Sequence, residues 1–282
     1  MSSQQDKHHI AFQGEAGAYS HIACQQFAPD LEPLPCATFE EAIGQVKSGG
    51  AQKAMLPIEN SVAGRVSDIH ALLPDSDLYI IGEHFLPIHH QLMALPGVKR
   101  EDLKVVRSHV MALGQCRKLF EKNDFLPEAS GDTAGAARIL RDNPNTSHGV
   151  IASKLAAEIY DLDIVAIDVE DAAHNTTRFL EMASEPMDAS SGDGDIVTSF
   201  VFQVRNIPSA LYKSLGGFAT NGVNMTKLES YQLDGTFSAT RFYADIEGHP
   251  EDEPVRLALE ELGFFSSSLK ILGVYRADRL RG

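Results

Sequence analysis

The sequence predicts an α/β fold in its first part and a smaller βαββαβ domain after it. Apolar, strand-like runs alternate with helical patterns through the first part, which is typical of a largely parallel sheet covered by helices. Residues 182–196 are rich in Ser, Gly, Asp and Ala and nearly free of large apolar side chains, which indicates a linker. Beyond this linker, the strand and helix patterns follow the ferredoxin-like order.

The first helices are expected where capping residues follow strand-like runs. A strand at 9–12 precedes a helical pattern that begins near Ser20. Thr38 and Glu41 match a capping box, since each side chain can bind a backbone N–H at the start of a helix, and Gly49 supplies the end of that helix. The other elements of this part are expected at 53–59 (strand), 78–95 (two or more strands), 103–108 (strand), 109–122 (helix capped by Ser108), 134–141 (helix capped by Thr133), 148–153 (strand), 154–160 (helix) and 163–171 (strand).

The second part is expected to hold four strands and two helices. A helix over 209–221 places Leu211, Leu215 and Phe218 on one face and ends at Gly222. The other elements are expected as strands at 198–204, 224–230, 237–248 and 268–275 and a helix at 255–262.

Composition restricts the classes of function. The chain has 282 residues with 43% hydrophobic content, which suits about two domains with real cores, and no apolar run approaches the ~18–20 residues of a membrane span. A net charge of −15 without a basic cluster argues against nucleic-acid binding, so an anion site needs local Arg and backbone N–H groups.

Cys24, Cys36 and Cys116 lack the spacing of a disulfide framework or zinc site. The N-terminus shows no apolar secretory segment, so we expect a reducing cytoplasmic setting.

Four polar segments follow strand ends, where ligands bind in α/β proteins. The first, at 14–20, offers two glycines and the Ser20 hydroxyl, which could hold an anion or could form only a tight turn with a helix cap. The second contains Glu59, Asn60 and Ser61, which could orient a substrate or could form only an Asx turn.

The third and fourth segments carry an imidazole and a guanidinium. His109 follows Ser108 and could titrate near neutrality, although a surface histidine is the commoner alternative. Residues 175–179 place adjacent hydroxyls beside an Arg suited to bidentate carboxylate capture, or they form a turn with an exposed Arg. His89 and His90 are neighbours in a strand pattern and would point to opposite faces, so we expect no shared metal.

Taken in order, the segments GEAGAYSHIA, PIENSVAGRV, SHVMALGQC, DTAGAA, GVIAS and NTTRF resemble the prephenate dehydratase family. The βαββαβ part resembles the ACT regulatory domain of that family, and the likeness covers about residues 9–276. The resemblance implies a catalytic domain at 8–181 with two subdomains of periplasmic-binding-protein-like (type II) topology. Their crossovers are expected near 85–95 and 168–172, followed by the linker and an ACT domain at 197–277.

The resemblance also implies an activity. It predicts the decarboxylating dehydration of prephenate to phenylpyruvate in L-phenylalanine biosynthesis, in the cleft between the subdomains and without a cofactor or metal. Thr177 would donate to the leaving hydroxyl, Arg178 would clamp a carboxylate or brace the cleft, and Phe179 would fix the turn. Glu59 is an alternative acid if burial raises its pKa. The substrate would be oriented by Asn60 and Ser61 and bound by Gly17, Ser20, Asn175 and Thr176.

The ACT resemblance implies a regulator and an assembly. L-Phenylalanine would bind to Ala210, Leu211, Asn224, Met225, Glu229 and Ser230. Ser209 stands where the family has Gly, and Tyr231-Gln232 stands where it has Arg-Pro, so the effector loop is altered. Because ACT domains pair with one another, we expect a homodimer or homotetramer.

Two alternatives to prephenate turnover stay open at this point. One is an arogenate dehydratase, which carries out the same elimination on the transaminated substrate. The other is a non-catalytic sensor of amino acids or small anions, because a fold does not fix a function. A pure sensor would need Arg178 but would have no need of Thr177.

Overall fold

The chain folds into two compact units, and strands β5 and β11 each include residues of both units. The first unit comprises 1–66 and 84–179, and the second comprises 67–83 and 180–282. In this computed structural model, the residues that are described are 8–187, 189–190, 194–205, 207–232 and 239–281.

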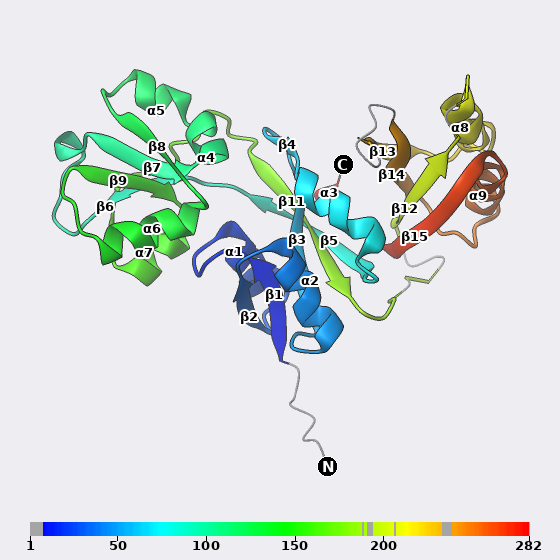
Figure 1. Ribbon diagram of the computed structural model, residues 1–282, viewed down its shortest axis with the longest axis horizontal. Helices are drawn as coiled ribbons and strands as arrows, with labels where there is room; N and C mark the ends of the chain where they lie inside the picture. Colours follow the sequence, from blue (N-terminus) through cyan, green and yellow to red (C-terminus); the bar gives the residue numbers. More distant parts are fainter. Residues whose placement is uncertain (1–7, 188, 191–193, 206, 233–238, 282) are drawn as a thin grey trace, which may run out of the picture. The chain divides into compact units, whose positions relative to one another are not determined.

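The first sheet has the strand order β2-β1-β3-β11-β5, with β4 beside β3 (Figure 1). Its strands are β1 (His9–Gln13), β2 (Glu32–Cys36), β3 (Lys53–Asn60), β4 (Gly64–Arg65), β5 (Tyr79–Pro87) and β11 (Thr176–Ala183). Strand β1 runs parallel to both β2 and β3, as the alternation of strands and helices predicts. The helices between these strands are α1 (Tyr19–Phe27) and α2 (Phe39–Ser48).

The second sheet has the strand order β10-β6-β9-β7-β8. Its strands are β6 (Gln91–Ala94), β7 (Val105–His109), β8 (Leu126–Ser130), β9 (His148–Ala152) and β10 (Asp163–Ala166). Strand β7 is parallel to β8 and β9, whereas β6 is antiparallel to β9 and β10. Helices lie on both faces of this sheet (Figure 1): α4 (Val110–Gln115), α5 (Arg117–Glu121), α6 (Thr133–Asp142) and α7 (Lys154–Tyr160), with a 3-10 turn η2 (Arg100–Asp102).

Two short crossovers connect the two sheets. The chain leaves β5 at Pro87 and enters β6 at Gln91, and it leaves β10 at Ala166 and enters β11 at Thr176. This double crossover between two α/β lobes is the periplasmic-binding-protein-like arrangement. One hydrophobic core draws on both lobes and includes Phe12, Met55, Met93, Val150 and Phe179.

The second unit carries a four-stranded antiparallel sheet with the order β13-β14-β12-β15. Its elements are β12 (Ile196–Val204), α8 (Ala210–Thr220), β13 (Met225–Gln232), β14 (Ala239–Glu247), α9 (Glu253–Phe265) and β15 (Ser266–Arg276). The βαββαβ order is the predicted one. Phe200, Phe218 and Leu262 belong to the core between its sheet and helices. The same unit includes α3 (Ser67–Leu72) and η1 (Leu73–Asp75), which the sequence patterns did not separate from the first part.

Two predicted helix caps were wrong. The predicted helix 109–122 is divided into α4 and α5 at Cys116, and His109 rather than Ser108 caps α4 by accepting the Met111 N–H. Because β7 extends to His109, the Ser108 side chain turns into the interior, where its hydroxyl donates to the Ile151 carbonyl at 2.6 Å.

Helix α6 is capped by Asp132 rather than Thr133. The Asp132 carboxylate accepts the Gly135 N–H at 2.6 Å, so the helix begins at the residue that was predicted to cap it. By contrast, the capping oxygen of Thr38 accepts the Glu41 N–H as predicted, and Gly49 ends α2 in the left-handed region.

Two strand predictions were also wrong in part. The predicted strand 163–171 ends at Ala166, and His89 and His90 lie in the crossover between β5 and β6 rather than within a strand. Residues 188 and 191–193 of the expected linker and 237–238 of the expected strand lie outside the described residues.

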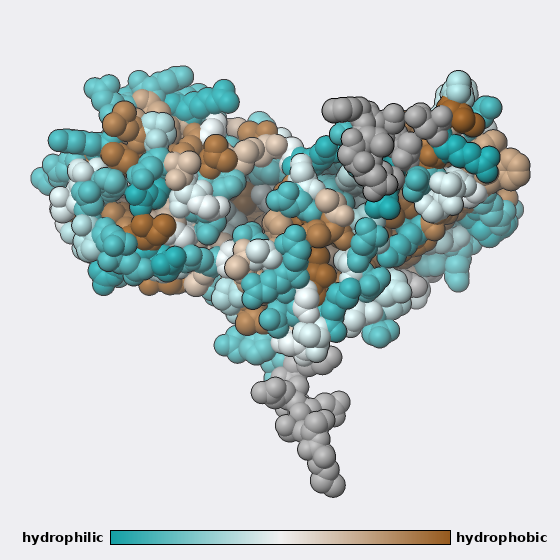
Figure 2. Space-filling model, in the orientation of Figure 1, coloured by the Kyte–Doolittle hydropathy of each residue, from teal (hydrophilic) through white to brown (hydrophobic). Residues whose placement is uncertain are grey.

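The face seen in Figure 2 is mainly hydrophilic, with hydrophobic residues scattered in small groups. Among the residues that the structure describes, no helix has both the length and the apolar character to cross a membrane.

Candidate active site

Asn60, the last residue of β3, joins the end of that strand to the start of β11. Its side-chain Nδ2 donates to Asn175 Oδ1 at 2.8 Å and to Thr177 Oγ1 at 3.0 Å. Its Oδ1 accepts the backbone N–H groups of Val62 and Ala63. With both amide hydrogens and the carbonyl oxygen engaged, the Asn60 side chain has a fixed orientation.

Gln115, at the end of α4, connects this cluster to the second lobe. Its Nε2 donates to Asn60 Oδ1 at 3.2 Å, while its Oε1 accepts from Asn175 Nδ2 at 3.2 Å. The same Oε1 lies 2.8 Å from His90 Nε2. His90 Nδ1 lies 2.7 Å from the Tyr19 hydroxyl, so the polar network runs from α1 to β11.

The ionisation of this network follows from its burial. Burial lowers the pKa of His90, although the hydrogen bond to Gln115 partly offsets this effect. Burial raises the pKa of Tyr19 well above its ordinary value, and the nearby Glu170 carboxylate adds to the shift. Because Gln115 Oε1 can only accept, a neutral His90 carries its proton on Nε2 and leaves Nδ1 to accept from Tyr19. The Tyr19 hydroxyl also lies 2.9 Å from the His89 carbonyl, a second acceptor for its proton.

Thr177 is buried on β11, and its hydroxyl oxygen accepts from Asn60. A hydroxyl that accepts through its oxygen keeps its own proton to donate. In the described part of the chain, the Thr177 O–H meets no acceptor. The arrangement therefore leaves a hydroxyl that can donate a hydrogen bond from a fixed position.

A cavity of about 260 Å³ adjoins the network. It is lined by Val62, Gly114, Gln115, Arg117, Glu170, Asp171, Ala172 and Asn175. The Asp171 carboxylate accepts the backbone N–H groups of Arg117 and Lys118 and so caps the start of α5. Arg117 brings a positive side chain to a lining that also carries two acids, within a protein whose net charge is −15.

Arg178 and Glu59 form an ion pair, with 3.0 Å between Nη1 and Oε1, and Arg178 is only 3% exposed. Successive residues of a strand point to opposite faces of the sheet. Since Asn60 and Thr177 meet on one face, their neighbours Glu59 and Arg178 meet on the other. Phe179 lies in the core of the first unit.

Ser61 and Thr176 fasten the loop that precedes β11. Ser61 Oγ donates to the His174 carbonyl at 2.7 Å and accepts the Thr176 N–H at 2.9 Å. The Ser61 N–H donates to the Thr176 carbonyl at 2.8 Å. These contacts hold the backbone that carries Asn175 and Thr177.

The turn before α1 is shaped by packing. Gly17 has φ +91°, and a Cβ there would lie 2.7 Å from Ala156 Cα in α7. Its N–H donates to His21 Nδ1 at 3.0 Å, and its carbonyl accepts from Ser153 Oγ. Ser20 is buried in α1. Because the two lobes approach so closely at this turn, position 17 has no room for a side chain.

His109, the remaining candidate of the first unit, caps α4 and lies outside this hydrogen-bonded network. Burial lowers its pKa.

The expected effector residues all lie in the second unit. Ala210 and Leu211 begin α8, directly after Ser209, whose φ of +63° lies in the region that favours glycine. Asn224 precedes β13 and Met225 begins it.

Along β13, side chains alternate between a half-buried and an exposed face. Glu229 is on the half-buried face, with its carboxylate 3.0 Å from Lys227 Nζ, whereas Ser230 is exposed. The Tyr231 hydroxyl hydrogen-bonds to His70 of α3.

Sequence reasoning gave no role to Tyr19, His90, Gln115 or Arg117, nor to Glu170 and Asp171 on the cavity wall. Gln115 was part of the third polar segment but was given no role, and Tyr19 was part of the first. His90 was set aside because its segment was taken as a strand. No sequence pattern around Arg117 indicates a site, because its place on the cavity wall depends on how α5 packs.

Comparisons with known proteins show the family of the chain. Residues 10–187 match the family model for prephenate dehydratase. The chain is 48% identical over 272 residues to a bifunctional N-acyl-homoserine lactone acylase/prephenate dehydratase of Komagataeibacter europaeus, covering 96% of this chain and 97% of that protein. It is 38% identical to arogenate dehydratase 2 of Petunia hybrida, covering 99% of this chain and 74% of that protein.

Two solved structures are similar over nearly the whole chain. One is described as GqqA, a novel type of quorum quenching acylase, with a TM-score of 0.89 at 48% identity, covering 97% of this chain and 99% of that one. The other is prephenate dehydratase from Arthrobacter aurescens in complex with L-Phe, with a TM-score of 0.86 at 31% identity, covering 95% of this chain and 89% of that one. The chain belongs to the prephenate dehydratase family.

Proposed function

We propose that this chain catalyses the decarboxylating dehydration of prephenate to phenylpyruvate. The observation that carries the proposal is the Thr177 hydroxyl, which accepts from Asn60 and keeps its own proton to donate. Asn60 also bonds Asn175 and Gln115, both of which line the 260 Å³ cavity. A hydroxyl donor suits a reaction in which charge develops on a departing oxygen.

The reaction fits a site that offers hydrogen-bond donors and a positively charged side chain. The bond from the ring to its carboxylate breaks, and its electron pair moves into the ring as carbon dioxide leaves. The ring C–O bond breaks at the opposite carbon, and the oxygen leaves as hydroxide, which takes up a proton from solvent to become water. Aromatisation drives both cleavages. The protein has to hold the substrate and stabilise the charge that develops on the departing oxygen.

In this proposal Thr177 donates a hydrogen bond to the leaving oxygen. The pKa of an alcohol is far too high for it to give up its proton fully, so Thr177 acts by stabilising charge. Asn60, held by Gln115, sets the direction of that donor. Removal of one such fixed donor typically lowers the rate about 10²–10³-fold.

Substrate carboxylates need positive partners, and Arg117 and Arg178 take different roles in this proposal. We assign carboxylate binding to Arg117, which lines the cavity, together with the Asn175 amide. Arg178 takes the bracing role, because its pairing with Glu59 holds β3 and β11 together on the face opposite Thr177. Glu59 is then part of this brace rather than the acid. Phe179 lies within β11 rather than in a turn, and it anchors that strand in the core.

The remaining expected contacts act on the frame of the site. Ser61 and Thr176 hold the loop before β11, and Gly17 with Ser20 positions α1 and Tyr19 beside the network. An anion at Gly17 would have to displace His21 from its N–H.

For the second part we propose an ACT domain at 197–277, separated from the catalytic domain at 8–181 by the linker 182–196. L-Phenylalanine is the proposed effector, supported by the antiparallel βαββαβ sheet and by the L-Phe complex of the Arthrobacter aurescens relative. Its proposed contacts are Ala210, Leu211, Asn224, Met225, Glu229 and Ser230. A homodimer or homotetramer is the proposed assembly.

Arogenate is the second candidate substrate. Its ammonium group would need a carboxylate, and Glu170 and Asp171 both line the cavity. Two relatives at 38% identity are named arogenate dehydratase or arogenate dehydratase/prephenate dehydratase, from Petunia hybrida and Arabidopsis thaliana.

The deciding experiment follows product formation by the purified chain from prephenate and from arogenate, each with and without L-phenylalanine. Hydrolysis of an N-acyl-homoserine lactone is measured in parallel, because the Komagataeibacter europaeus relative is named for both activities. We expect prephenate turnover, and absence of turnover with both cyclohexadienyl substrates would overturn the proposal.

The variant Thr177→Val keeps the shape of the side chain but removes the donor. We expect kcat to fall about 10²–10³-fold with KM within a few-fold of wild type. Thr176→Val is the matched control, because it removes the neighbouring hydroxyl on the other face of the strand. An equal loss of kcat in both variants would remove Thr177 from the mechanism.

A further inference from the structure

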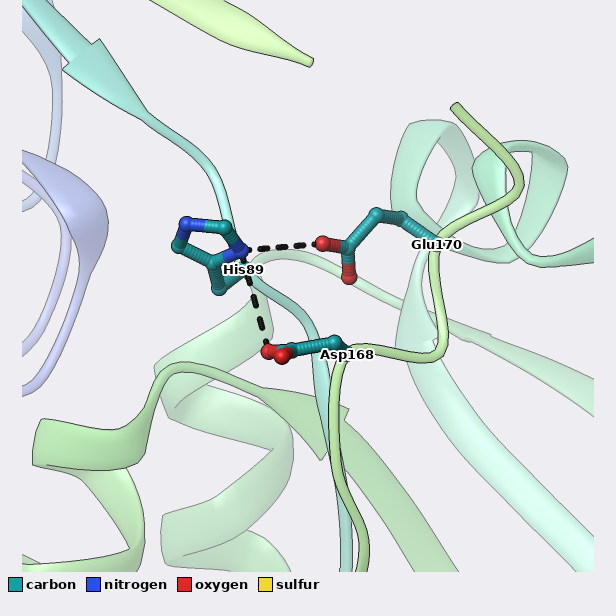
Figure 3. Close-up of side chains that lie close together, drawn as sticks. All are labelled: His89, Asp168 and Glu170. Carbon is teal, nitrogen blue, oxygen red and sulfur yellow. Dashed lines mark hydrogen bonds and ion pairs between the residues drawn. The ribbon is translucent and has the colours of Figure 1, made fainter. Parts of the chain in front are cut away.

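His89, Asp168 and Glu170 come together from the two crossovers of the first unit (Figure 3). His89 Nδ1 lies 3.1 Å from Glu170 Oε1 and 3.7 Å from Asp168 Oδ1. The ligand-type atoms of all three lie within 4.8 Å of one another, and the described residues hold no second group of this kind. The proposed dehydration gives Asp168 and His89 no role.

Both carboxylates are held in place by other hydrogen bonds. The His90 backbone N–H donates to Glu170 Oε2 at 2.8 Å, which leaves Oε1 directed at the imidazole. Gln91 Nε2 donates to Asp168 Oδ1 at 3.1 Å, and the Asp168 N–H donates back to the same amide. Such supporting bonds orient ligands before an ion arrives.

The exposure of the three side chains suits an ion that enters from solvent. The Glu170 side chain is only 6% exposed, whereas those of His89 and Asp168 are 56% and 57% exposed. One ligand is therefore fixed in the interior, and the other two face water and can close on an ion.

We propose that His89 Nδ1, Asp168 and Glu170 form a binding site for a divalent transition-metal cation of the Zn²⁺ class, with water completing the coordination. One imidazole nitrogen with two carboxylate oxygens is a donor set for such ions, whereas Mg²⁺ and Ca²⁺ prefer oxygen alone. Bonds of about 2.0–2.2 Å in tetrahedral geometry separate ligand atoms by roughly 3.3–3.6 Å. The observed 3.1 and 3.7 Å lie on either side of that range.

Such an ion would tie the two crossovers together. His89 lies on the segment 88–90, and both acids lie on 167–175, the only stretches between the two sheets in the described part of the first unit. Domain closure in two-lobed proteins bends at such connections. A bound ion would therefore restrain the lobes, and Glu170 would carry its effect to the cavity wall.

The test uses Co²⁺ as a spectroscopic probe. The purified 282-residue chain is stripped of metal with a chelator and dialysed. It is then titrated with Co²⁺ while the visible ligand-field bands are recorded, and Zn²⁺ is added in competition. We expect bands that saturate at one ion per chain and disappear with Zn²⁺. A titration that gives no saturable bands would overturn the proposal.

Matched variants locate the site. His89→Gln and Asp168→Asn each remove one ligand from an exposed position, and both should weaken binding at least tenfold. His148→Gln is the control, because its Nδ1 lies 3.9 Å from the single carboxylate of Glu128. Wild-type affinity in both ligand variants would refute the assignment. The readout is independent of turnover, so failure of the dehydratase proposal would leave this result standing.

Discussion

The Asn60 side-chain amide donates to the Thr177 hydroxyl oxygen, with 3.0 Å between Nδ2 and Oγ1, across neighbouring strands of the first sheet. The direction of this bond matters more than its strength. A hydroxyl that accepts from an amide is left to donate its own proton. The hydroxyl of Thr177 is thus left to donate, and its partner Asn60 also bonds Asn175 and Gln115, which line the cavity.

The substitution Asn60→Asp should reverse that direction. A carboxylate can only accept, so the Thr177 hydroxyl would donate its proton to the new side chain instead of to the substrate. We expect kcat for prephenate to fall about 10²–10³-fold with a much smaller change in KM. Steady-state kinetics measure both. An N60D enzyme with a tenth or more of wild-type kcat would contradict the argument.

Gly17 should be intolerant of a side chain because of what it packs against. Gly17→Ala meets both a φ of +91° and the Ala156 backbone at 2.7 Å. Gly97→Ala is the control, since φ is +80° there but no atom lies within 4 Å of the added Cβ. We expect Gly97→Ala to cost about 1 kcal/mol of unfolding free energy and Gly17→Ala about 1–3 kcal/mol more. Urea unfolding measures the difference, and equal losses would exclude the packing explanation.

Arg281 should stabilise the second unit strongly. It lies 2.6 Å from Glu83 Oε2 and 3.1 Å from Asp245 Oδ2, and both carboxylate side chains are 0% exposed. Arg281→Met would leave two buried charges without this partner, at a cost of about 3–5 kcal/mol.

The exposed pair of Arg256 with Glu260, at 2.6 Å in α9, supplies the comparison. Arg256→Met should change the unfolding free energy by about 0.5 kcal/mol or less. Both variants are measured by urea unfolding at neutral pH. Similar small effects would show that burial adds nothing at Arg281.

Cys36 should make stability depend on alkaline pH. Burial raises the pKa of its thiol to about 11, with a further contribution from Glu41. The unfolded thiol has a pKa of about 8.5, so the folded state holds its proton more tightly. The resulting stability is complete below about pH 8.5 and is lost as the pH rises toward 11.

The measurement compares wild type with Cys36→Ala. Between about pH 9 and 10.5, the unfolding free energy of wild type should fall more steeply, by up to about 1.4 kcal/mol per pH unit. Parallel pH profiles in the two proteins would disprove the role of this thiol.

Local patterns predicted much of the architecture. The Thr38 cap of α2, the left-handed Gly49 and the βαββαβ order all depend on residues a few positions apart, where steric and hydrogen-bonding preferences act directly. The polar segments that contain Asn60 and Thr177 were found for the same reason. The predicted cap at Ser108 was wrong because β7 runs further than expected. The length of a strand depends on its partners elsewhere in the sheet.

Only the tertiary structure decided which polar side chains meet. Asn60 and Thr177 are 117 residues apart, and the pairing of β3 with β11 placed them on one face and Glu59 with Arg178 on the other. Gln115 reached Asn60 through the packing of the second lobe. The sequence by itself determined the elements and their order, since these follow from short-range periodicity. The register between distant strands, which comes from the packing of the whole core, determined the site.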